Sequence, residues 1–113
     1  MIYHIAQSGD WHNALSSGSY VTDSLQVEGF IHCSTIDQVL QVAKNFYAGQ
    51  SDLVLLQIDP RRVTPSIRYE DLYQAGDLFP HIYGPLNLDA VVSSHEFVSD
   101  SEGDFQMPEQ LMG

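Results

Sequence analysis

Residues 53–58 have the sequence LVLLQI, a short run that is apolar at all but one position. The run is too short for a typical helix and has the length of a strand that is covered on both faces. We therefore expect residues 53–58 to form a central strand of a sheet. Asp59 and Pro60 follow directly and are expected to end it.

Further strands are expected on both sides of this run. Residues 2–6 alternate in the manner of a strand, which places His4 on the face opposite to Tyr3. Residues 28–33 are expected to form another strand, and its alternation gives His32 the same face as Glu28. A short strand is expected over residues 67–69, and a last strand over residues 90–98.

Two helices are expected between these strands. Asp10 is a candidate N-cap for a short helix that Gly18 can end in the left-handed conformation. The strongest helical pattern follows Thr35, where a capping-box spacing precedes apolar residues at helical intervals, and it closes at Gly49. Ser34 is a further candidate for the cap of this helix.

The remaining segments predict the fold class. Asp71 can cap a single helical turn that ends at Gly76. Residues 79–86, FPHIYGPL, contain two prolines and a glycine and are expected to form a shaped loop. Strands and helices do not alternate regularly, so the sequence favours an α+β fold over a doubly wound parallel fold.

Composition limits the classes of function. The chain has 113 residues, a net charge of −11 and only four Lys and Arg residues, so binding to nucleic acid is not expected. Cys33 is the single cysteine, which excludes an internal disulfide and suits a reducing compartment. The sequence begins without a signal peptide or a membrane span, so a cytoplasmic protein is expected.

The end of the chain differs in composition from the rest. From about Ser99 the sequence loses its apolar periodicity and gathers acidic residues. We expect one domain over residues 1–98 and a flexible acidic tail over residues 99–113. No site residue is expected in the tail.

Histidines are the most concentrated chemistry in the sequence. His4, His32 and His81 each lie within an apolar or aromatic string, where an unpaired polar ring would be costly to bury. Each therefore has either a structural partner, such as a backbone carbonyl, or a function. Their spacing matches no zinc motif, so no metal site is expected. His12 and His95 have more polar neighbours and are expected at the surface.

His32 is the most informative of these residues. It is expected to end a strand just before the N-terminus of a helix, a place that favours an anion. Ser34 can cap the helix or offer its hydroxyl to a ligand, and Tyr83 can form an aromatic wall for a flat ligand or pack the loop.

Two glutamates near the histidines each have alternative roles. Glu28 and Glu70 each lie beside bulky apolar residues, so each can orient a histidine or pair with Arg68. A nucleophilic pair of His32 and Cys33 is not expected, because adjacent strand residues point to opposite faces.

Several strings in this order resemble a known family. They are IYHIA, GFIHCST, LVLLQID and FPHIYGPL, at residues 2–6, 29–35, 53–59 and 79–86. Through them the chain is similar, over nearly all of residues 2–98, to the family called domain of unknown function 952. Its members resemble in fold the ADP-ribosyltransferase superfamily, in which two small, strongly twisted sheets hold NAD in a cleft.

The resemblance implies roles for particular residues. His4 would bond the nicotinamide ribose and His32 would lie against the nicotinamide, so these two are the candidate catalytic residues. Candidate cofactor-binding residues are Ser34, His81, Tyr83 and Arg68. In active transferases a third motif position is often a glutamate, whereas the last expected strand offers apolar residues with Glu96 beyond them.

Two functions follow as hypotheses. One is an enzyme that uses NAD as a substrate and transfers ADP-ribose or cleaves NAD, at a cleft that holds His4 and His32. The alternative is a regulatory domain that binds a nucleotide or small anion without reaction. The expected partner in both is a small-molecule nucleotide, without a nucleic acid or a membrane. A protein with an inert cleft is a third reading.

Overall fold

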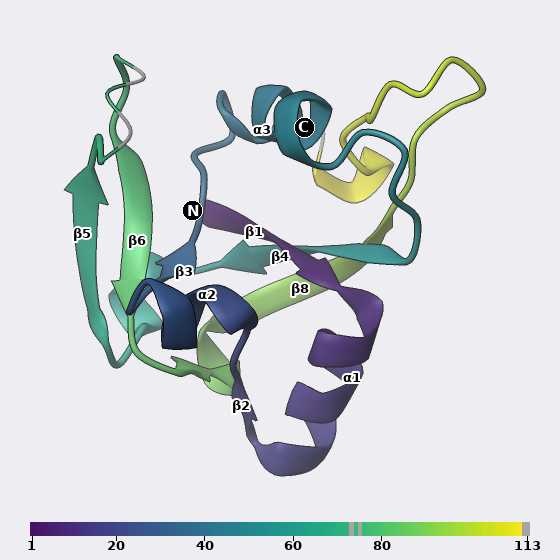
Figure 1. Ribbon diagram of the computed structural model, residues 1–113. Coiled ribbons are helices and arrows are strands. Elements are labelled where there is room, and N and C mark those ends of the chain that lie inside the picture. The colour runs from purple at the N-terminus through teal and green to yellow at the C-terminus, as the bar shows by residue number, and fades with distance from the viewer. Residues whose placement is uncertain (73, 75, 112–113) are drawn as a thin grey trace.

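The computed structural model describes residues 1–72, 74 and 76–111 and has an α+β fold with several small antiparallel sheets (Figure 1). Helices are few, as expected for this class. In the described part of the chain, no helix has the length and apolar character needed to cross a bilayer.

The first sheet contains the run that was expected to be central. Its order is β1 (Ile2–Gln7), β4 (Leu53–Ile58) and β8 (Val91–Phe97), all antiparallel, so the prediction of a central strand at LVLLQI is confirmed. β4 is covered on both faces because it contributes to two hydrophobic clusters. Leu56 belongs to one cluster and Leu55 to the other.

The second sheet has the order β3 (Ile31–His32), β6 (Phe79–Tyr83) and β5 (Ser66–Glu70). The expectation of a shaped loop over residues 79–86 was therefore wrong, because FPHIY is the middle strand of this sheet. Pro80 has no N–H to donate to a neighbouring strand. The sheet tolerates it because β3 ends before the position opposite Pro80. Its carbonyl accepts a hydrogen bond from the Cys33 N–H at 3.0 Å.

The two sheets are joined at one edge of β1. Tyr3 and Ser34 form an isolated antiparallel bridge, in which each N–H donates to the carbonyl of the other residue. A third, two-stranded pair consists of β2 (Ser19–Tyr20) and β7 (Leu86–Asn87). The bridge brings the end of β3 beside the start of β1, and both segments carry a candidate site histidine.

The expected strand over residues 28–33 is shorter in the structure. Helix α2 (Asp23–Val27) occupies the preceding segment, and Glu28 is its C-cap residue. Gly29 has a φ of 89°, in the left-handed region, so the chain turns there before β3 begins. Glu28 and His32 therefore lie on different elements, and strand alternation does not relate them.

The two remaining helices were expected, with different starting points. Helix α1 (Ser8–Ser17) begins after Gln7, so Asp10 lies in its first turn instead of capping it, and Gly18 ends it in the left-handed conformation. Helix α3 (Val39–Phe46) begins after a turn, and the Gln38 side chain accepts a bond from the Thr35 N–H at 2.9 Å. The turn expected over residues 71–76 includes residues 73 and 75, which lie outside the described residues.

Short 3₁₀ helices complete the fold, at Pro60–Arg62, Leu88–Ala90 and Glu109–Leu111. The last of these belongs to the segment expected to be an acidic tail. Phe105 in that segment is buried, and its ring stacks on Phe97 with centroids 5.0 Å apart. The hydrophobic cluster beneath α3 therefore extends into residues beyond 98.

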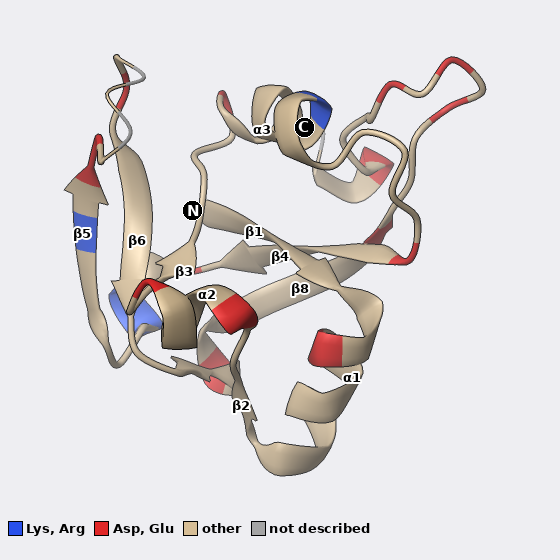
Figure 2. Ribbon diagram, viewed as in Figure 1, with Lys and Arg blue, Asp and Glu red and all other residues tan. Residues whose placement is uncertain are grey.

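Acidic residues outnumber basic residues in this fold. Figure 2 shows acidic positions spread over many elements and few basic ones. Asp59 is buried at the end of β4, and its carboxylate accepts bonds from the backbone and side chain of Arg61. Bonds from the Arg61 side chain and backbone hold the pKa of Asp59 below its ordinary value. We assign this ion pair a structural role at the end of β4.

Candidate functional site

His4 lies on β1 with its ring buried between the two sheets. Its Nδ1 atom bonds the backbone carbonyl oxygen of His32, and its Nε2 atom lies 2.8 Å from the hydroxyl of Tyr20. A carbonyl only accepts, so Nδ1 carries the proton of the neutral ring and the Tyr20 hydroxyl donates to Nε2. Both ring nitrogens are therefore occupied by protein groups.

Burial keeps this histidine neutral. Removal of the ring from water lowers the pKa of His4 to about 4, and the bond to the His32 carbonyl opposes that shift only in part. Burial also raises the pKa of Tyr20, which contacts the His4 ring edge-on at a centroid distance of 5.2 Å. His4 and Tyr20 thus form a neutral hydrogen-bonded pair inside the protein.

His32 lies on β3 and has a different environment. Its Nε2 atom is 2.9 Å from a carboxylate oxygen of Glu28, and the two side chains are 39% and 35% exposed. When Glu28 is ionised it can only accept, so Nε2 carries the ring proton. The Phe30 ring meets the His32 ring edge-on, with centroids 4.9 Å apart. His32 is therefore held by protein groups and still reaches the solvent.

His81 lies directly across the ladder from His32. The two are register partners on β3 and β6, and their rings are 5.4 Å apart. His81 is only 2% exposed, because the ring of Phe30 stacks over it at 4.2 Å. Its Nδ1 atom lies 3.1 Å from Glu70 on β5.

Glu70 also accepts a hydrogen bond from Tyr83, over 2.5 Å. This bond is the main cause that lowers the pKa of Glu70, and it likewise raises the pKa of Tyr83. Of the alternatives that the sequence left open for Glu70, orientation of a histidine is the one that the structure shows. Arg68 lies instead over the Tyr83 ring, with its guanidinium carbon 4.8 Å from the ring centroid.

These side chains share one face of the second sheet. Arg68, His81 and His32 are neighbours across its three strands, and directly paired residues of an antiparallel ladder point to the same side. The opposite side carries Ile31 and Ile82, which are fully buried in the core. We call the side that carries His32, Glu70, His81, Tyr83 and Arg68 the outer face.

Ser34 does not belong to the outer face. It is buried at the bridge with Tyr3. The N-cap position of α3 is Gln38, without a side-chain cap bond, so the expected capping role of Ser34 is not seen. The structure thus brings four of the six predicted site residues together, while His4 and Ser34 lie at the junction behind them.

Two residues of this arrangement were missed in the sequence. Phe30 was not singled out, although its ring contacts both outer-face histidines. Tyr20 was not singled out, because its partner His4 is 16 residues away and the two-residue strand that carries it has no periodic signal. The only available signal was the demand of a buried histidine for two hydrogen-bond partners.

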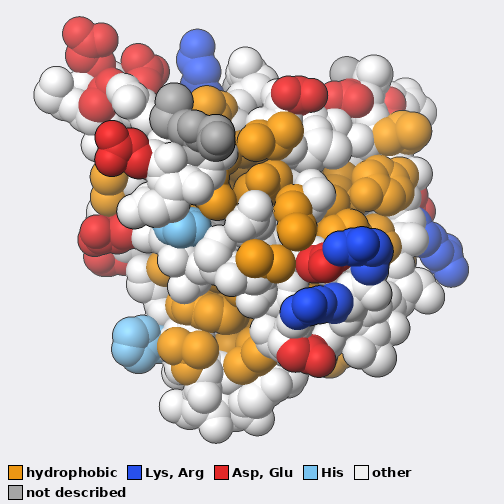
Figure 3. Space-filling model, turned by 180° about the vertical axis from the view of Figure 1, so that it is seen from behind, with side chains coloured by type: hydrophobic (Ala, Val, Ile, Leu, Met, Phe, Trp, Pro, Cys, Tyr) orange, Lys and Arg blue, Asp and Glu red, His pale blue; other side chains and the backbone are white. Residues whose placement is uncertain are grey.

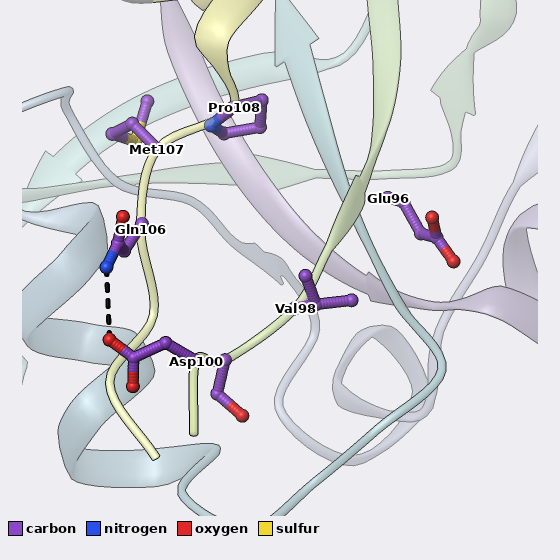
Figure 4. A pocket seen from close by; sticks show the side chains of 7 residues that line it. Glu96, Val98, Asp100, Gln106, Met107 and Pro108 are labelled. Atoms are coloured by element: carbon purple, nitrogen blue, oxygen red, sulfur yellow. Dashed lines mark hydrogen bonds between the residues drawn. The ribbon is translucent and has the colours of Figure 1, made fainter. Parts of the chain in front are cut away.

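Two hollows of the surface lie elsewhere. One, of about 260 Å³, lies between the end of β8 and residues 106–108, where Asp100 accepts a bond from Gln106 (Figure 4). The other, of about 270 Å³, lies between α1 and β8. Neither is lined by a predicted site residue. Among the described residues, no three His, Cys, Asp or Glu side chains are placed to hold a metal ion.

The comparison with known families agrees with the resemblance seen in the sequence. The model of the family described as protein of unknown function DUF952 matches residues 5–94. The chain belongs to the DUF952 family. His32, Glu28 and all residues of the outer face fall within the matched part of this DUF952 chain.

Solved structures show a similar architecture in another protein. The crystal structure of protein CC0527 from Caulobacter crescentus matches with a TM-score of 0.87 at 28% identity, covering 98% of this chain and 97% of that chain. The solution NMR structure of CC0527 matches with a TM-score of 0.82 at 29% identity, covering 97% and 95%. Among curated proteins, none matches this chain.

The chemistry available at the DUF952 outer face is that of a polar, aromatic surface. It offers a histidine held by a carboxylate, a tyrosine hydroxyl and an exposed guanidinium. A guanidinium suits a phosphate group, and a carboxylate-held imidazole suits proton transfer or a hydrogen bond to a hydroxyl. A ligand with both phosphate and hydroxyl groups would use all of these.

Proposed function

We propose that this DUF952 protein is ADP-ribosyltransferase-like and binds NAD on the outer face, where it transfers ADP-ribose or cleaves NAD. The observation that carries the proposal is the His32 ring, which is 39% exposed and held at 2.9 Å by Glu28. Two small antiparallel sheets joined at Tyr3 and Ser34 support the likeness in fold.

The reaction assigns different tasks to the outer-face residues. The bond between the nicotinamide nitrogen and ribose C1′ breaks, and its electron pair leaves with nicotinamide. A new bond forms between C1′ and the oxygen of an acceptor hydroxyl or water, whose proton passes to the His32 and Glu28 pair. Arg68 and Tyr83 bind the pyrophosphate and the flat ring. Most of the acceleration then comes from orientation of the acceptor.

His4 has a supporting task in this proposal. Both of its nitrogens bond protein groups, so it holds the backbone of His32 and does not touch the ligand. We therefore assign His4 as a positioning residue and His32 as the residue that contacts the substrate. This separates two residues that the sequence had placed together at one cleft.

Titration with NAD tests the proposal. We expect NAD to shift the imidazole NMR signals of His32 and wild-type protein to release nicotinamide, with release lost in His32→Ala. His12→Ala is the matched control, because His12 is an exposed histidine on α1. Unchanged His32 signals at millimolar NAD would contradict the proposal. Equal release of nicotinamide by His32→Ala and by wild type would contradict it as well.

Binding without reaction is the second candidate function. It is favoured by the burial of His4, which takes one of the two expected catalytic histidines away from the ligand. This candidate predicts that NAD or ADP-ribose shifts the His32 signals while wild-type protein releases no nicotinamide. A release that depends on His32 would exclude it.

A further inference from the structure

Strand β8 lies at an edge of the first sheet and pairs on one side only, with β4. In the part of the chain that the structure describes, no backbone group of β8 bonds outside that ladder. Side chains at even-numbered positions of the strand and just beyond it are exposed, with Val92 51% and Val98 60% exposed. An edge of this kind is a ready template for another strand.

The two surface hollows lie along this edge and meet at Glu96. One has Trp11, Leu15 and Val54 among its walls, and the other has Val98 and Met107. Glu96 lines both. We call the joined surface the β8 trough. Figure 4 shows Glu96 on β8 and Val98 just after the end of that strand, with Met107 and Pro108 on the last segment of the chain.

Apolar groups and acidic charge characterise the trough. Figure 3 shows hydrophobic side chains gathered across the back of the molecule, with two histidines at one border of that region. All four Lys and Arg residues of the chain are described, and none of them lines the trough, whereas Glu96 and Asp100 do. The charged groups that face an occupant are therefore acidic.

We propose that the β8 trough binds an extended basic peptide, which adds a strand to β8. Residues two apart on a strand share a face and lie about 7 Å from one another. A peptide with lysine at position i+2 and apolar residues at i and i+4 therefore presents all three side chains on one face. In either strand direction, one apolar side chain reaches the hollow beside Trp11 and the lysine meets Glu96, which lies on the same face of the sheet as Val54. Main-chain bonds supply affinity and the hollows supply selectivity.

Charge argues for this partner over a second copy of the chain. Each copy carries a net charge of −11, so two copies repel one another, while a basic peptide is attracted. Self-pairing through β8 would also bring two Glu96 carboxylates into the same interface. The inference is independent of the proposed NAD site, because no outer-face residue lines the trough.

The test uses the capped peptide Thr-Leu-Thr-Lys-Thr-Leu-Thr and a matched peptide with glutamate in place of lysine. We expect the lysine peptide to shift the backbone amide signals of residues 91–98 and the fluorescence of Trp11, the single tryptophan. We expect Glu96→Lys to weaken its binding about tenfold or more, and Glu102→Lys, an exposed acidic control, to weaken it less than about threefold.

Four outcomes would overturn the proposal. They are unchanged amide signals at millimolar peptide, equal affinity for the two peptides, equal effects of Glu96→Lys and Glu102→Lys, or a dimer in sedimentation whose formation protects the amides of β8. Glu96→Lys changes an exposed side chain, so we expect the variant to fold. A thermal melt checks this. Replacement of Val92 by lysine gives a second variant of the same edge.

Discussion

His4 and His32 are joined by a hydrogen bond, yet they belong to two different kinds of region. The region of His4 and Tyr20 is buried, and both nitrogens of the histidine are bonded. The region of His32 and Glu28 is more than a third exposed and lies on the outer face. A ring of the same chemistry therefore holds the sheets together in one region and remains partly exposed to solvent in the other.

The difference shows that burial and bonding, instead of residue type, decide the role of a histidine here. A buried ring with two partners would lose both bonds if it turned toward a ligand, which is costly. A partly exposed ring such as that of His32 can exchange a bond to the protein for a bond to water, so its penalty is smaller. The predictions below separate the two regions by measurements of stability.

Replacement of His4 by alanine gives the largest expected loss. It leaves a cavity and removes the partners of the Tyr20 hydroxyl and the His32 carbonyl, so the free energy of unfolding is expected to fall by about 3 to 5 kcal/mol. Urea denaturation at pH 7.5 measures it. His12→Ala is the control and should change the same quantity by less than about 0.5 kcal/mol. A loss below about 1 kcal/mol for His4→Ala would contradict a holding role.

The pH dependence of stability should show the same contrast. The pKa of His4 is about 4 in the folded protein, whereas a histidine side chain in water has a pKa of 6.5. Below 6.5 the unfolded chain binds a proton that the folded ring refuses, so stability falls as the pH drops toward 4. The stability of wild type relative to His4→Gln should decrease by about 3 kcal/mol between pH 7.5 and 4. If the difference in stability between wild type and His4→Gln is constant over this pH range, His4 is not held in the neutral form by burial.

Replacement of Tyr20 by phenylalanine should have a smaller effect. It leaves Nε2 of His4 as a buried acceptor without its donor, at an expected cost of about 2 kcal/mol in the free energy of unfolding. The double variant with His4→Gln should lose less than the sum of the two single losses, since the pair shares one bond. Additive losses in denaturant melts would argue against the bond.

The smallest expected loss of stability follows replacement of His32 by alanine. Its side chain is partly exposed and pairs with an exposed carboxylate, so the free energy of unfolding should fall by less than about 1 kcal/mol. The backbone carbonyl that accepts from His4 is retained. A loss as large as that of His4→Ala would place both residues in the same structural region and remove the contrast.

Part of the fold could be predicted because the sequence carried strong local signals. LVLLQI is apolar on both faces and predicted β4, and alternation placed His4 correctly on the face opposite to Tyr3. FPHIYGPL was misjudged because prolines usually interrupt sheets, and the sequence does not show that the neighbouring strand ends beside Pro80. A two-residue strand such as β2 has no periodicity to detect.

The site was predictable in part for similar reasons. Apolar surroundings marked His4, His32 and His81 as residues that need partners, and all three have them. The identity of the partners depends on register between distant segments, which one sequence does not give. Phe105 illustrates the same limit, because an acidic neighbourhood concealed an aromatic ring that packs on Phe97.

An imidazole NMR spectrum with and without NAD tests the contrast between the two histidines most directly. We predict that His4 stays in the neutral form with the proton on Nδ1 from pH 7.5 to about pH 5. We also predict that NAD shifts the ring signals of His32 far more than those of His4. A proton on Nε2 of His4, or a larger response to NAD at His4 than at His32, would contradict the contrast.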